Sequence, residues 1–377
     1  MKKFISNRWG DFAINFTVVI TFTLALSWLL DYDPYSLFEG TSDFNSGDYY
    51  DRVYHHNHTL PLDTNITIVP ADNIPNDRLP DVLRRIAGFG AKAIGFDLIF
   101  RNESSITDEL IDVIDSLPQI VMPVSLTYDR ESGKVCHDEH SLLDEYLDGK
   151  IFATVTFPPR SVMSYQREFY IKVPDDGDSI GSFAFVLARM IKPDLVIPND
   201  RNIENINFNI SEVDTTGYNE LYDSAIEENI KRRIFDKIVL VGEIHNGYDV
   251  HPTAVDDEMP GIKIHAAAIS TLLSNRPLKP LGKTWTIIFI IVCVAVVTIA
   301  DAYFADKDDF RKGIAFLGIK GVFLVLMLVG GYALYIYCGV RSDFTYSITL
   351  FLFSMMIADL WFGFRNYLTD RKQNKKK

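Results

Sequence analysis

The sequence predicts a mixed α/β domain carried on four transmembrane α-helices. Three observations support this fold class. Four long stretches are almost wholly apolar, residues 31–282 alternate strand-like and helix-like patterns, and the charges are segregated along the chain. The 377 residues carry a formal net charge of −13, yet residues 31–282 alone carry −20. Apolar residues make up 47% of the chain, which excludes a disordered chain, and the acidic balance argues against a basic nucleic-acid-binding protein.

Each apolar stretch is long enough to cross a bilayer, which requires about 20 residues of helix. A soluble helix of that length would show a polar face, and these stretches show none. No small-residue cleavage site follows the first stretch, so we expect an uncleaved anchor and not a signal peptide. The four expected spans are residues 12–30, 285–304, 314–337 and 344–364.

The distribution of lysine and arginine predicts the orientation of these spans, because basic loops stay in the cytoplasm. Basic residues gather in the N-terminal segment 1–11, in the loop after the second span and in the tail 365–377. We therefore expect both termini in the cytoplasm and residues 31–282 on the far side of the membrane. The basic tail is suited to anionic lipid, so we expect membrane lipid as one partner.

Two charged residues, Lys320 and Asp359, fall within the third and fourth expected spans. Each lies about six residues, or about 9 Å of helix, from the cytoplasmic end of its span. An isolated charge at this depth is costly, so we expect the two side chains to form an ion pair. The alternative is that the Lys320 ammonium extends alone to the membrane surface.

The period of the apolar residues predicts the elements of the middle domain. Residues 237–242, KIVLVG, form an almost continuous apolar run, as expected for a parallel strand covered on both faces. Ser105 and Asp108 have the spacing of a capping box before the helix 107–117. The expected strands are 66–71, 93–100, 119–124, 151–156, 168–173, 203–209 and 237–242, and the expected helices are 79–89, 107–117, 182–191 and 261–274.

Two segments carry a resemblance to a known family. The first is AIGFDLIF at 93–100, with the lead-in GFGAK before it, and the second is KIVLVGEIHNGYDVHPTAVDDEMPGIKIHAAAISTLL at 237–273. Both resemble the type-two CHASE domain, a sensory extracellular domain of bacterial cyclases, histidine kinases and Ser/Thr kinases. The resemblance extends over about residues 40–280. It implies an α/β sensor domain outside the bacterial inner membrane, with one span before it and three after it.

The chain departs from the family pattern in three ways. An acidic motif after the first strand has only Asp72 as its counterpart, and the Thr-Pro of the family is Thr253-Ala254 here. Family members usually continue into a kinase or a cyclase, and no such motif follows the last expected span. We therefore expect a domain without a fused output domain, which signals through a separate membrane or cytoplasmic partner.

Polar residues follow two expected strands at their carboxyl ends, where open parallel sheets bind ligands. The candidate ligand-binding residues are Asp97, Gly242, Glu243, Asp249, His251 and Thr253. Their carboxylates, imidazole and hydroxyl would converge on a small polar ligand or a cation. The alternatives are that Asp97 accepts backbone N–H groups of a neighbouring loop, and that Asp249 and Thr253 make local turn hydrogen bonds.

Other histidines and one cysteine are weaker candidates. His265 falls on the apolar face of the helix 261–274, so we expect it in the core. Two clusters contain metal-ligating residue types but lack the spacing of a structural zinc site. They are His55, His56 and His58, and Cys136, His137 and His140. We expect these residues to be solvated, and we expect no bound cofactor.

Three functions remain open from the sequence. The leading one is a membrane-anchored sensory module that binds an unknown small molecule or protein and performs no catalysis, since no catalytic motif is present. A metal-assisted hydrolase that uses the loop 243–253 is the first alternative, and a structural subunit of an envelope complex is the second. None of the three requires nucleic acid, and all are compatible with a homodimer.

Overall fold

The computed structural model describes most of the chain between residues 46 and 341. The described ranges are 46–72, 74–128, 135–137, 141–147, 149–159, 165–175, 178–195, 202–245, 249–282 and 310–341, with scattered residues in 13–21 and 284–299. The chain divides into two compact units. One is Asp51–Leu278, and the other combines Met1–Tyr50 with Lys279–Lys377.

A six-stranded sheet forms the centre of the unit Asp51–Leu278. Its strand order is β11-β1-β12-β2-β3-β6, and every pair of neighbouring strands is parallel. The strands are β1 (Leu62–Pro70), β2 (Ala93–Asp97), β3 (Ile120–Val124), β6 (Ile151–Thr154), β11 (Glu212–Thr215) and β12 (Ile238–Gly242). The α/β class with a parallel sheet, predicted from the sequence, is therefore confirmed.

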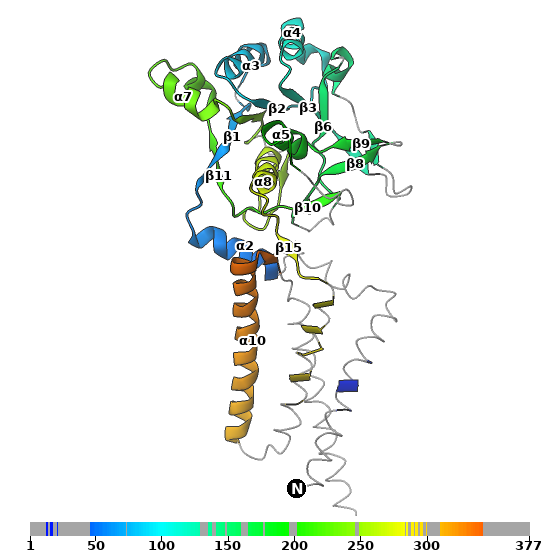
Figure 1. Cartoon of the computed structure of the whole chain (residues 1–377), viewed down its shortest axis with the longest axis vertical. Coiled ribbons are helices and arrows are strands. Elements are labelled where there is room, and N and C mark those ends of the chain that lie inside the picture. The colour runs from blue at the N-terminus through cyan, green and yellow to red at the C-terminus, as the bar shows by residue number, and fades with distance from the viewer. Residues whose placement is uncertain are drawn as a thin grey trace, which may run out of the picture. The chain divides into compact units, whose positions relative to one another are not determined.

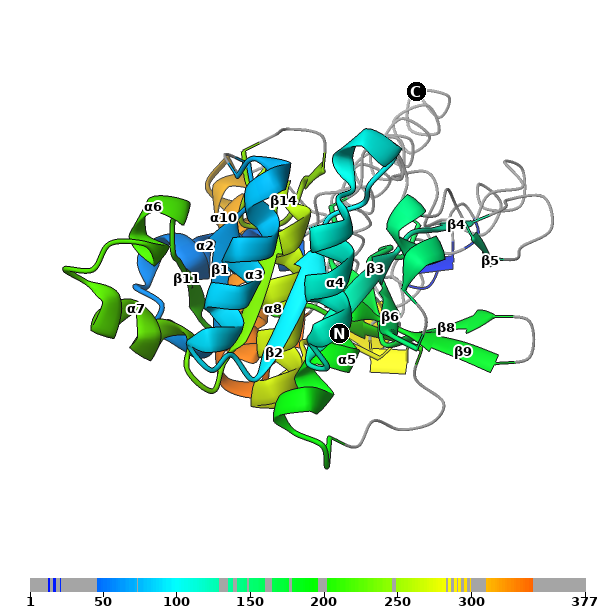
Figure 2. The ribbon, with the colours of Figure 1, turned by 90° about the horizontal axis from the view of Figure 1, so that it is seen from above.

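Helices cover both faces of this sheet, and the two views agree on their placement (Figure 1 and Figure 2). One face packs against α3 (Leu79–Gly88), α4 (Asp108–Ser116), α6 (Tyr218–Leu221) and α7 (Glu227–Ile234), and the other against α5 (Phe183–Ile191) and α8 (Gly261–Ser274). Successive residues of a strand point to opposite faces. In β12, Val239 and Val241 therefore belong to the core beneath α3, α4, α6 and α7, and Ile238 and Leu240 belong to the core beneath α5 and α8. Burial on both faces explains the continuous apolar run.

Shorter elements surround the sheet. They are α2 (Ser46–Asn57), the 3-10 turns η1 (Asn76–Arg78), η2 (Glu103–Ser105) and η3 (Leu142–Tyr146), and the antiparallel pairs β4 (Leu126–Tyr128) with β5 (Val135–His137), β7 (Glu168–Tyr170) with β10 (Ile203–Asn205), β8 (Lys172–Asp175) with β9 (Asp178–Gly181), and β13 (Val250–His251) with β14 (Met259–Pro260). The expected strand 168–173 is thus two strands with different partners. Among the elements that were not predicted are α2, α6, α7, β11 and the short strands β4, β5, β9, β13 and β14.

The start of α4 corrects one prediction. Thr107 is the N-cap residue, and its hydroxyl oxygen accepts a hydrogen bond from the Leu110 amide at 3.2 Å. Ser105 lies in the preceding 3-10 turn, so the capping box from Ser105 to Asp108 is wrong. Thr107 has an extended backbone and is followed by two acidic residues in the first turn, which satisfies the same helix end equally well.

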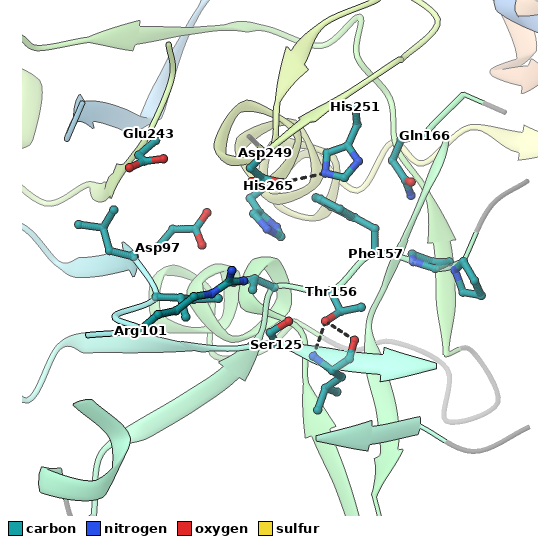
Figure 3. Close-up of a pocket in the computed structure, with 16 residues that line it drawn as sticks. Asp97, Arg101, Ser125, Thr156, Phe157, Gln166, Glu243, Asp249, His251 and His265 are labelled. Carbon is teal, nitrogen blue, oxygen red and sulfur yellow. Dashed lines mark hydrogen bonds and ion pairs between the residues drawn. The ribbon is translucent and has the colours of Figure 1, made fainter. Parts of the chain in front are cut away.

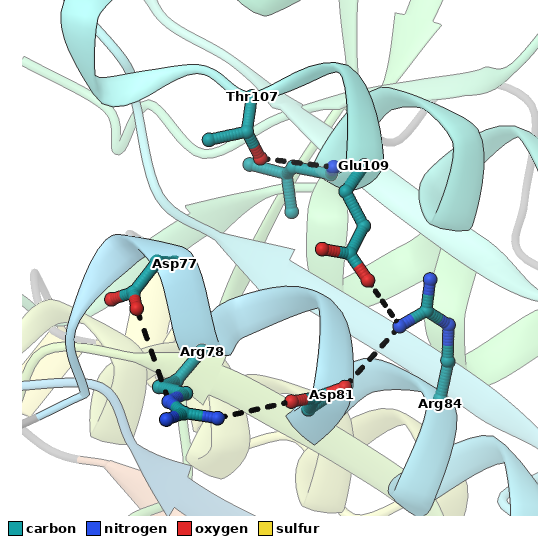
Figure 4. A network of polar contacts seen from close by, with 7 residues as sticks. Asp77, Arg78, Asp81, Arg84, Thr107 and Glu109 are labelled. Carbon is teal, nitrogen blue, oxygen red and sulfur yellow. Dashed lines mark hydrogen bonds and ion pairs between the residues drawn. The ribbon is translucent and has the colours of Figure 1, made fainter.

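A polar network joins α3 to α4 on the surface (Figure 4). The Arg84 guanidinium donates to Glu109 at 2.6 Å and to Asp81 at 3.2 Å, and Arg78 lies 3.6 Å from the same Asp81. These side chains are about half exposed or more. Ion pairs in water contribute little to stability, so the buried apolar side chains of α3 and α4 hold these helices on the sheet.

The second unit contains α10 (Phe310–Cys338), which overlaps the expected span 314–337. Its segment Gly321–Cys338 is the one helix in the described part of the chain that is long and apolar enough to cross a membrane. Four large apolar residues on it have between 57% and 62% of their surface exposed: Val322, Val325, Leu326 and Val329. The spans expected at 12–30 and 344–364, and most of 285–304, lie outside the described residues.

The predicted ion pair between Lys320 and Asp359 stays a prediction. Lys320 lies in α10, but its side chain is not among those described, and Asp359 lies outside the described residues. A different ion pair is present near the end of α10. Arg341, in the two-residue strand β16 (Val340–Arg341) that pairs with β15 (Lys279–Pro280), donates to Asp48 of α2, and both side chains are buried.

Candidate functional site

Two parallel strands place the candidate residues at one edge of the sheet. In the register of β2 and β12, Asp97 is the direct partner of Gly242. Asp97 and Glu243, the residue after Gly242, therefore leave the sheet side by side at its carboxyl edge. This is the edge where open α/β sheets bind ligands.

Gly242 is required here by space. A Cβ atom at this position would lie 2.6 Å from Cδ1 of Ile262 and 3.2 Å from both Cβ and the carbonyl oxygen of Asp97. Ile262 belongs to α8 and is itself buried, so it has little freedom to retreat. Gly242 thus lets α8 approach the ends of β2 and β12.

Replacing Gly242 with alanine should lower the free energy of unfolding by about 1–3 kcal/mol, because the added methyl overpacks the contact with Ile262 and Asp97. Denaturant unfolding of the full-length protein in detergent micelles measures the change. Gly88→Ala is the matched control, since a Cβ there meets no atom within 4 Å. Equal stability of Gly242→Ala and the native protein would show that this contact is loose.

A pocket of about 680 Å³ opens at the carboxyl edge. Four of the six candidate residues line it: Asp97, Glu243, Asp249 and His251. Figure 3 shows Asp97 and Glu243 on one side, Phe157, Gln166 and His251 on the other, and His265 between them. The full lining is Asp97, Leu98, Ile99, Arg101, Ser125, Leu126, Val155, Thr156, Phe157, Pro158, Pro159, Gln166, Glu243, Asp249, His251 and His265.

Asp249 is held between the first turn of α8 and a histidine. A Cβ at Gly261, the first residue of α8, would overlap the Asp249 carboxylate, and the Gly261 amide donates to the Asp249 carbonyl at 2.9 Å. His251 Nε2 lies 2.9 Å from Asp249 Oδ1. Partial desolvation opposes ionisation, but the hydrogen bond and charge of His251 outweigh it and hold the pKa of Asp249 below its ordinary value of 3.8. Asp249 is therefore an anion at neutral pH.

Asp97 has a different environment. Among the described residues, no hydrogen bond reaches its carboxylate, so the alternative in which it accepts backbone N–H groups is not seen. Burial raises the pKa of Asp97 to about 7, and the negative charges of Asp249 and Glu243 contribute to the same shift. The pocket thus brings together carboxylates that repel one another.

His265 was predicted in the core, and it is only 4% exposed. Its ring stacks on Phe157 with centroids 4.6 Å apart and meets the edge of Phe183 at 5.3 Å. Burial lowers the pKa of His265 to about 4, so the imidazole is neutral at pH 7. A neutral imidazole has one nitrogen that donates and one that accepts. The sequence did not predict that this ring also lines the pocket, although it lies one turn from Gly261.

The wall formed by Phe157 and Gln166 was also missed, because no sequence pattern distinguishes it. Gln166 is 3% exposed and is fixed by two hydrogen bonds. Its backbone N–H donates to the Pro252 carbonyl at 2.7 Å, and its side-chain Nε2 donates to the Glu168 carbonyl at 2.5 Å. The first of these bonds ties the wall to the loop that carries His251.

Asp72 fixes the loop that follows β12. Its carboxylate accepts hydrogen bonds from the backbone amides of Ile244 at 2.9 Å and His245 at 2.6 Å. Burial opposes the charge, but these bonds outweigh it and keep the pKa of Asp72 below 3.8. The residue that the sequence identified as a counterpart of a family acid therefore positions the backbone next to Glu243.

Thr253 and Gly242 do not line the pocket. Thr253 is buried, and its hydroxyl donates to the Asp256 carbonyl at 2.8 Å and accepts from the Asp256 amide at 3.1 Å. The local-turn alternative therefore describes Thr253. Asp249, in contrast, contacts His251 and α8 as well as its own loop.

The two histidine clusters are only partly described, and no group of three metal-ligating side chains occurs among the described residues. His55 is bonded to Asn209 at 3.2 Å, and His58 to the Tyr54 carbonyl at 2.9 Å. Cys136 and His137 lie in β5, but their side chains are not described, and His140 lies outside the described residues.

The structure is an α/β domain whose parallel sheet has a pocket at its carboxyl edge. The family model of the CHASE2 domain matches residues 63–300, which include all of the six-stranded sheet except Leu62, the first residue of β1, and the whole lining of the pocket. The chain therefore belongs to the CHASE2 family, a family of extracellular sensory domains, as predicted from the sequence. No curated protein and no solved structure gave a match.

Proposed function

We propose that this chain is a membrane-anchored sensor whose extracytoplasmic CHASE2 domain binds a small molecule in the pocket at the carboxyl edge of the sheet. The observation that carries the proposal is the coincidence of the two family-like segments with the pocket. Asp97 ends the first segment's strand, and Glu243, Asp249, His251 and His265 all belong to the second. Side chains from two distant segments converge on one open space, as in a preformed ligand site.

Membrane anchoring is supported by the surface of α10. Val322, Val325, Leu326 and Val329 are spaced so that they share one face of the helix, and each is more than half exposed, which suits a lipid environment. We propose that this helix and the expected spans 12–30, 285–304 and 344–364 cross the bacterial inner membrane. Both termini then face the cytoplasm.

Signalling follows from differential binding. A ligand shifts a conformational equilibrium only by the difference between its affinities for the two states. We propose that ligand binding favours one packing of the domain, that the membrane helices carry this change inward, and that a separate protein produces the output. The chain itself performs no catalysis in this scheme.

Ligand binding is tested by thermal-shift screening of the full-length protein in detergent micelles against a panel of small organic cations, anions and neutral molecules. A ligand that binds only the folded state raises Tm, by RT ln(1 + [L]/Kd) in free energy. The expected result is a hit that Phe157→Ala weakens. The proposal fails if no compound shifts Tm, or if every shift is independent of Phe157.

The orientation is tested by cysteine labelling in intact cells, in a variant in which the three native cysteines are serine. Glu228 is 75% exposed on α7, so a Glu228→Cys variant is accessible to reagent. We expect a membrane-impermeant maleimide to label it from outside. The control, Asn374→Cys in the basic tail, should react only after permeabilisation. The reverse pattern would place the domain in the cytoplasm.

A further inference from the structure

We propose that the pocket is selective for a small organic amine, with the ammonium group among Asp97, Glu243 and Asp249 and the apolar body against Phe157. This inference rests on the proposed ligand-binding function and specifies the class of ligand. It is carried by the charge of the pocket, by its hydrogen-bonding character and by its apolar wall.

The charge of the lining favours a cation. Three carboxylates line the pocket, and they come from three separate places in the chain: the end of β2, the residue after β12 and the loop before β13. Arg101 is the one lysine or arginine among the lining residues, and it is exposed. Since like charges within one low-dielectric space repel, a bound cation would relieve the repulsion among the three carboxylates.

The carboxylates and His265 provide hydrogen-bond acceptors. Carboxylates accept only, and the neutral His265 ring presents one nitrogen that accepts. His265 is buried and belongs to the lining, and the described residues supply no hydrogen bond to that accepting nitrogen. An ammonium group has three donors and no acceptor, so it complements this arrangement.

The remaining wall is apolar. The Phe157 ring packs on both histidines, at 4.6 Å from His265 and 5.2 Å from His251, so it is fixed in place. Pro158, Pro159 and Val155 continue the wall. A pocket of about 680 Å³ accommodates an organic body as well as the charged group, and an aromatic face next to the ammonium adds a cation–π attraction.

A bare metal ion fits less well. Metal ligands must converge to about 2.0–2.6 Å from one point, and the described residues contain no group of three that does so. An ammonium nitrogen stands about 2.7–2.9 Å from each acceptor, and its N–H groups point in different directions. An ammonium group therefore does not need the close convergence of ligands that a metal ion requires.

The test is calorimetric titration of the full-length protein in detergent micelles at pH 8 with three probes of similar body. They are 2-phenylethylamine, 3-phenylpropionate and L-phenylalanine, which carry an ammonium, a carboxylate and both. We expect the amine to bind most tightly, the amino acid more weakly and the acid not at all. Preference for the acid or for the amino acid would overturn the proposal. Binding of calcium, magnesium or zinc chloride in competition with the amine, and more tightly than it, would also overturn it.

Two isosteric variants locate the ammonium. Asp97→Asn and Glu243→Gln each remove one charge from the pocket, and we expect each to weaken amine binding about 10- to 100-fold, as for the loss of a charge-assisted hydrogen bond. Glu228→Gln, on the surface of α7 and outside the pocket lining, is the matched control and should bind like the native protein. An unchanged affinity in both pocket variants, with folding verified by thermal unfolding, would contradict the proposal.

These outcomes separate the ligand class from the function. If the screen finds a ligand whose effect depends on Phe157 but which carries no amine, the pocket is a sensor site and the amine assignment is wrong. If no class of compound binds, the proposed function itself fails.

Discussion

Asp97→Asn should make the protein more stable at pH 8, on the order of 4 kcal/mol in the free energy of unfolding. The pKa of Asp97 is raised from its ordinary value of 3.8 to about 7, and a tenfold change in an acid dissociation constant corresponds to about 1.36 kcal/mol. Asparagine has nearly the same shape and no charge, so it removes the cost of placing an anion beside Asp249 and Glu243. Denaturant unfolding of the full-length protein across a pH series measures the difference.

The sign of the pH dependence follows from linkage. Because the folded pKa of Asp97 lies above the unfolded value, the folded protein holds this proton more tightly. The contribution of Asp97 to stability is therefore greatest below pH 3.8, is lost as the pH rises to about 7, and is constant above that. The advantage of Asp97→Asn over the native protein should grow over the same interval.

A second group titrates in the opposite sense, so the difference between proteins is the informative quantity. Burial lowers the pKa of His265 from 6.5 to about 4, and its stabilising contribution is therefore lost as the pH falls from 6.5 toward 4. In the native protein the two effects partly cancel. Subtracting the Asp97→Asn curve removes the His265 contribution. If the stability difference between Asp97→Asn and the native protein does not vary between pH 4 and pH 7, the pKa of Asp97 is not raised.

Asp48→Ala should lower the free energy of unfolding by on the order of 3 kcal/mol, because it leaves the buried guanidinium of Arg341 without this anion. Asp48 is fully buried, and its neighbour Tyr50 packs against Tyr332 and Tyr335 of α10, with ring centroids 5.9 and 6.3 Å away. Loss of the pair therefore also disturbs an aromatic contact. Unfolding in detergent micelles, followed by tyrosine near-ultraviolet circular dichroism, provides the measurement.

The double variant Asp48→Ala with Arg341→Met distinguishes a charge effect from a packing effect. Removing both charges from a buried pair is often close to neutral, whereas removing one leaves an uncompensated ion. We expect the double variant to recover most of the lost stability. A double variant as unstable as the single one would mean that the packing of Asp48, and not its charge, is what matters.

Local sequence patterns predicted the elements whose apolar residues alone indicate which faces are buried. The run 237–242 is apolar on both faces because β12 lies inside the sheet, and the helix 261–274 has the bounds that its periodicity predicted. The strand β11 was missed because it is an edge strand with no buried residue, and α7 because its mean composition is polar and only Ile230 and Ile234 are buried.

The candidate site was predictable only on one side. Asp97, Glu243, Asp249 and His251 follow strands or precede a helix, so a rule about carboxyl edges identifies them. The opposite wall depends on tertiary packing: Phe157 and Gln166 meet the loop that carries His251 from a distant part of the chain, and no local pattern records that contact. The role of Gly261 was missed for the same reason, because the absence of its side chain leaves room for the carboxylate of Asp249.

The strand order also bears on how this chain acquires its structure. The strands β1 and β2 are close in sequence, yet β12 lies between them and pairs with both, Val241 with Val69 and with Phe96. The two halves of the sheet therefore stay apart until β12, which ends at Gly242, has been synthesised. Such distant pairing slows folding and leaves strand edges open in the meantime. A nascent chain of this kind depends on protection from aggregation until β12 closes the sheet.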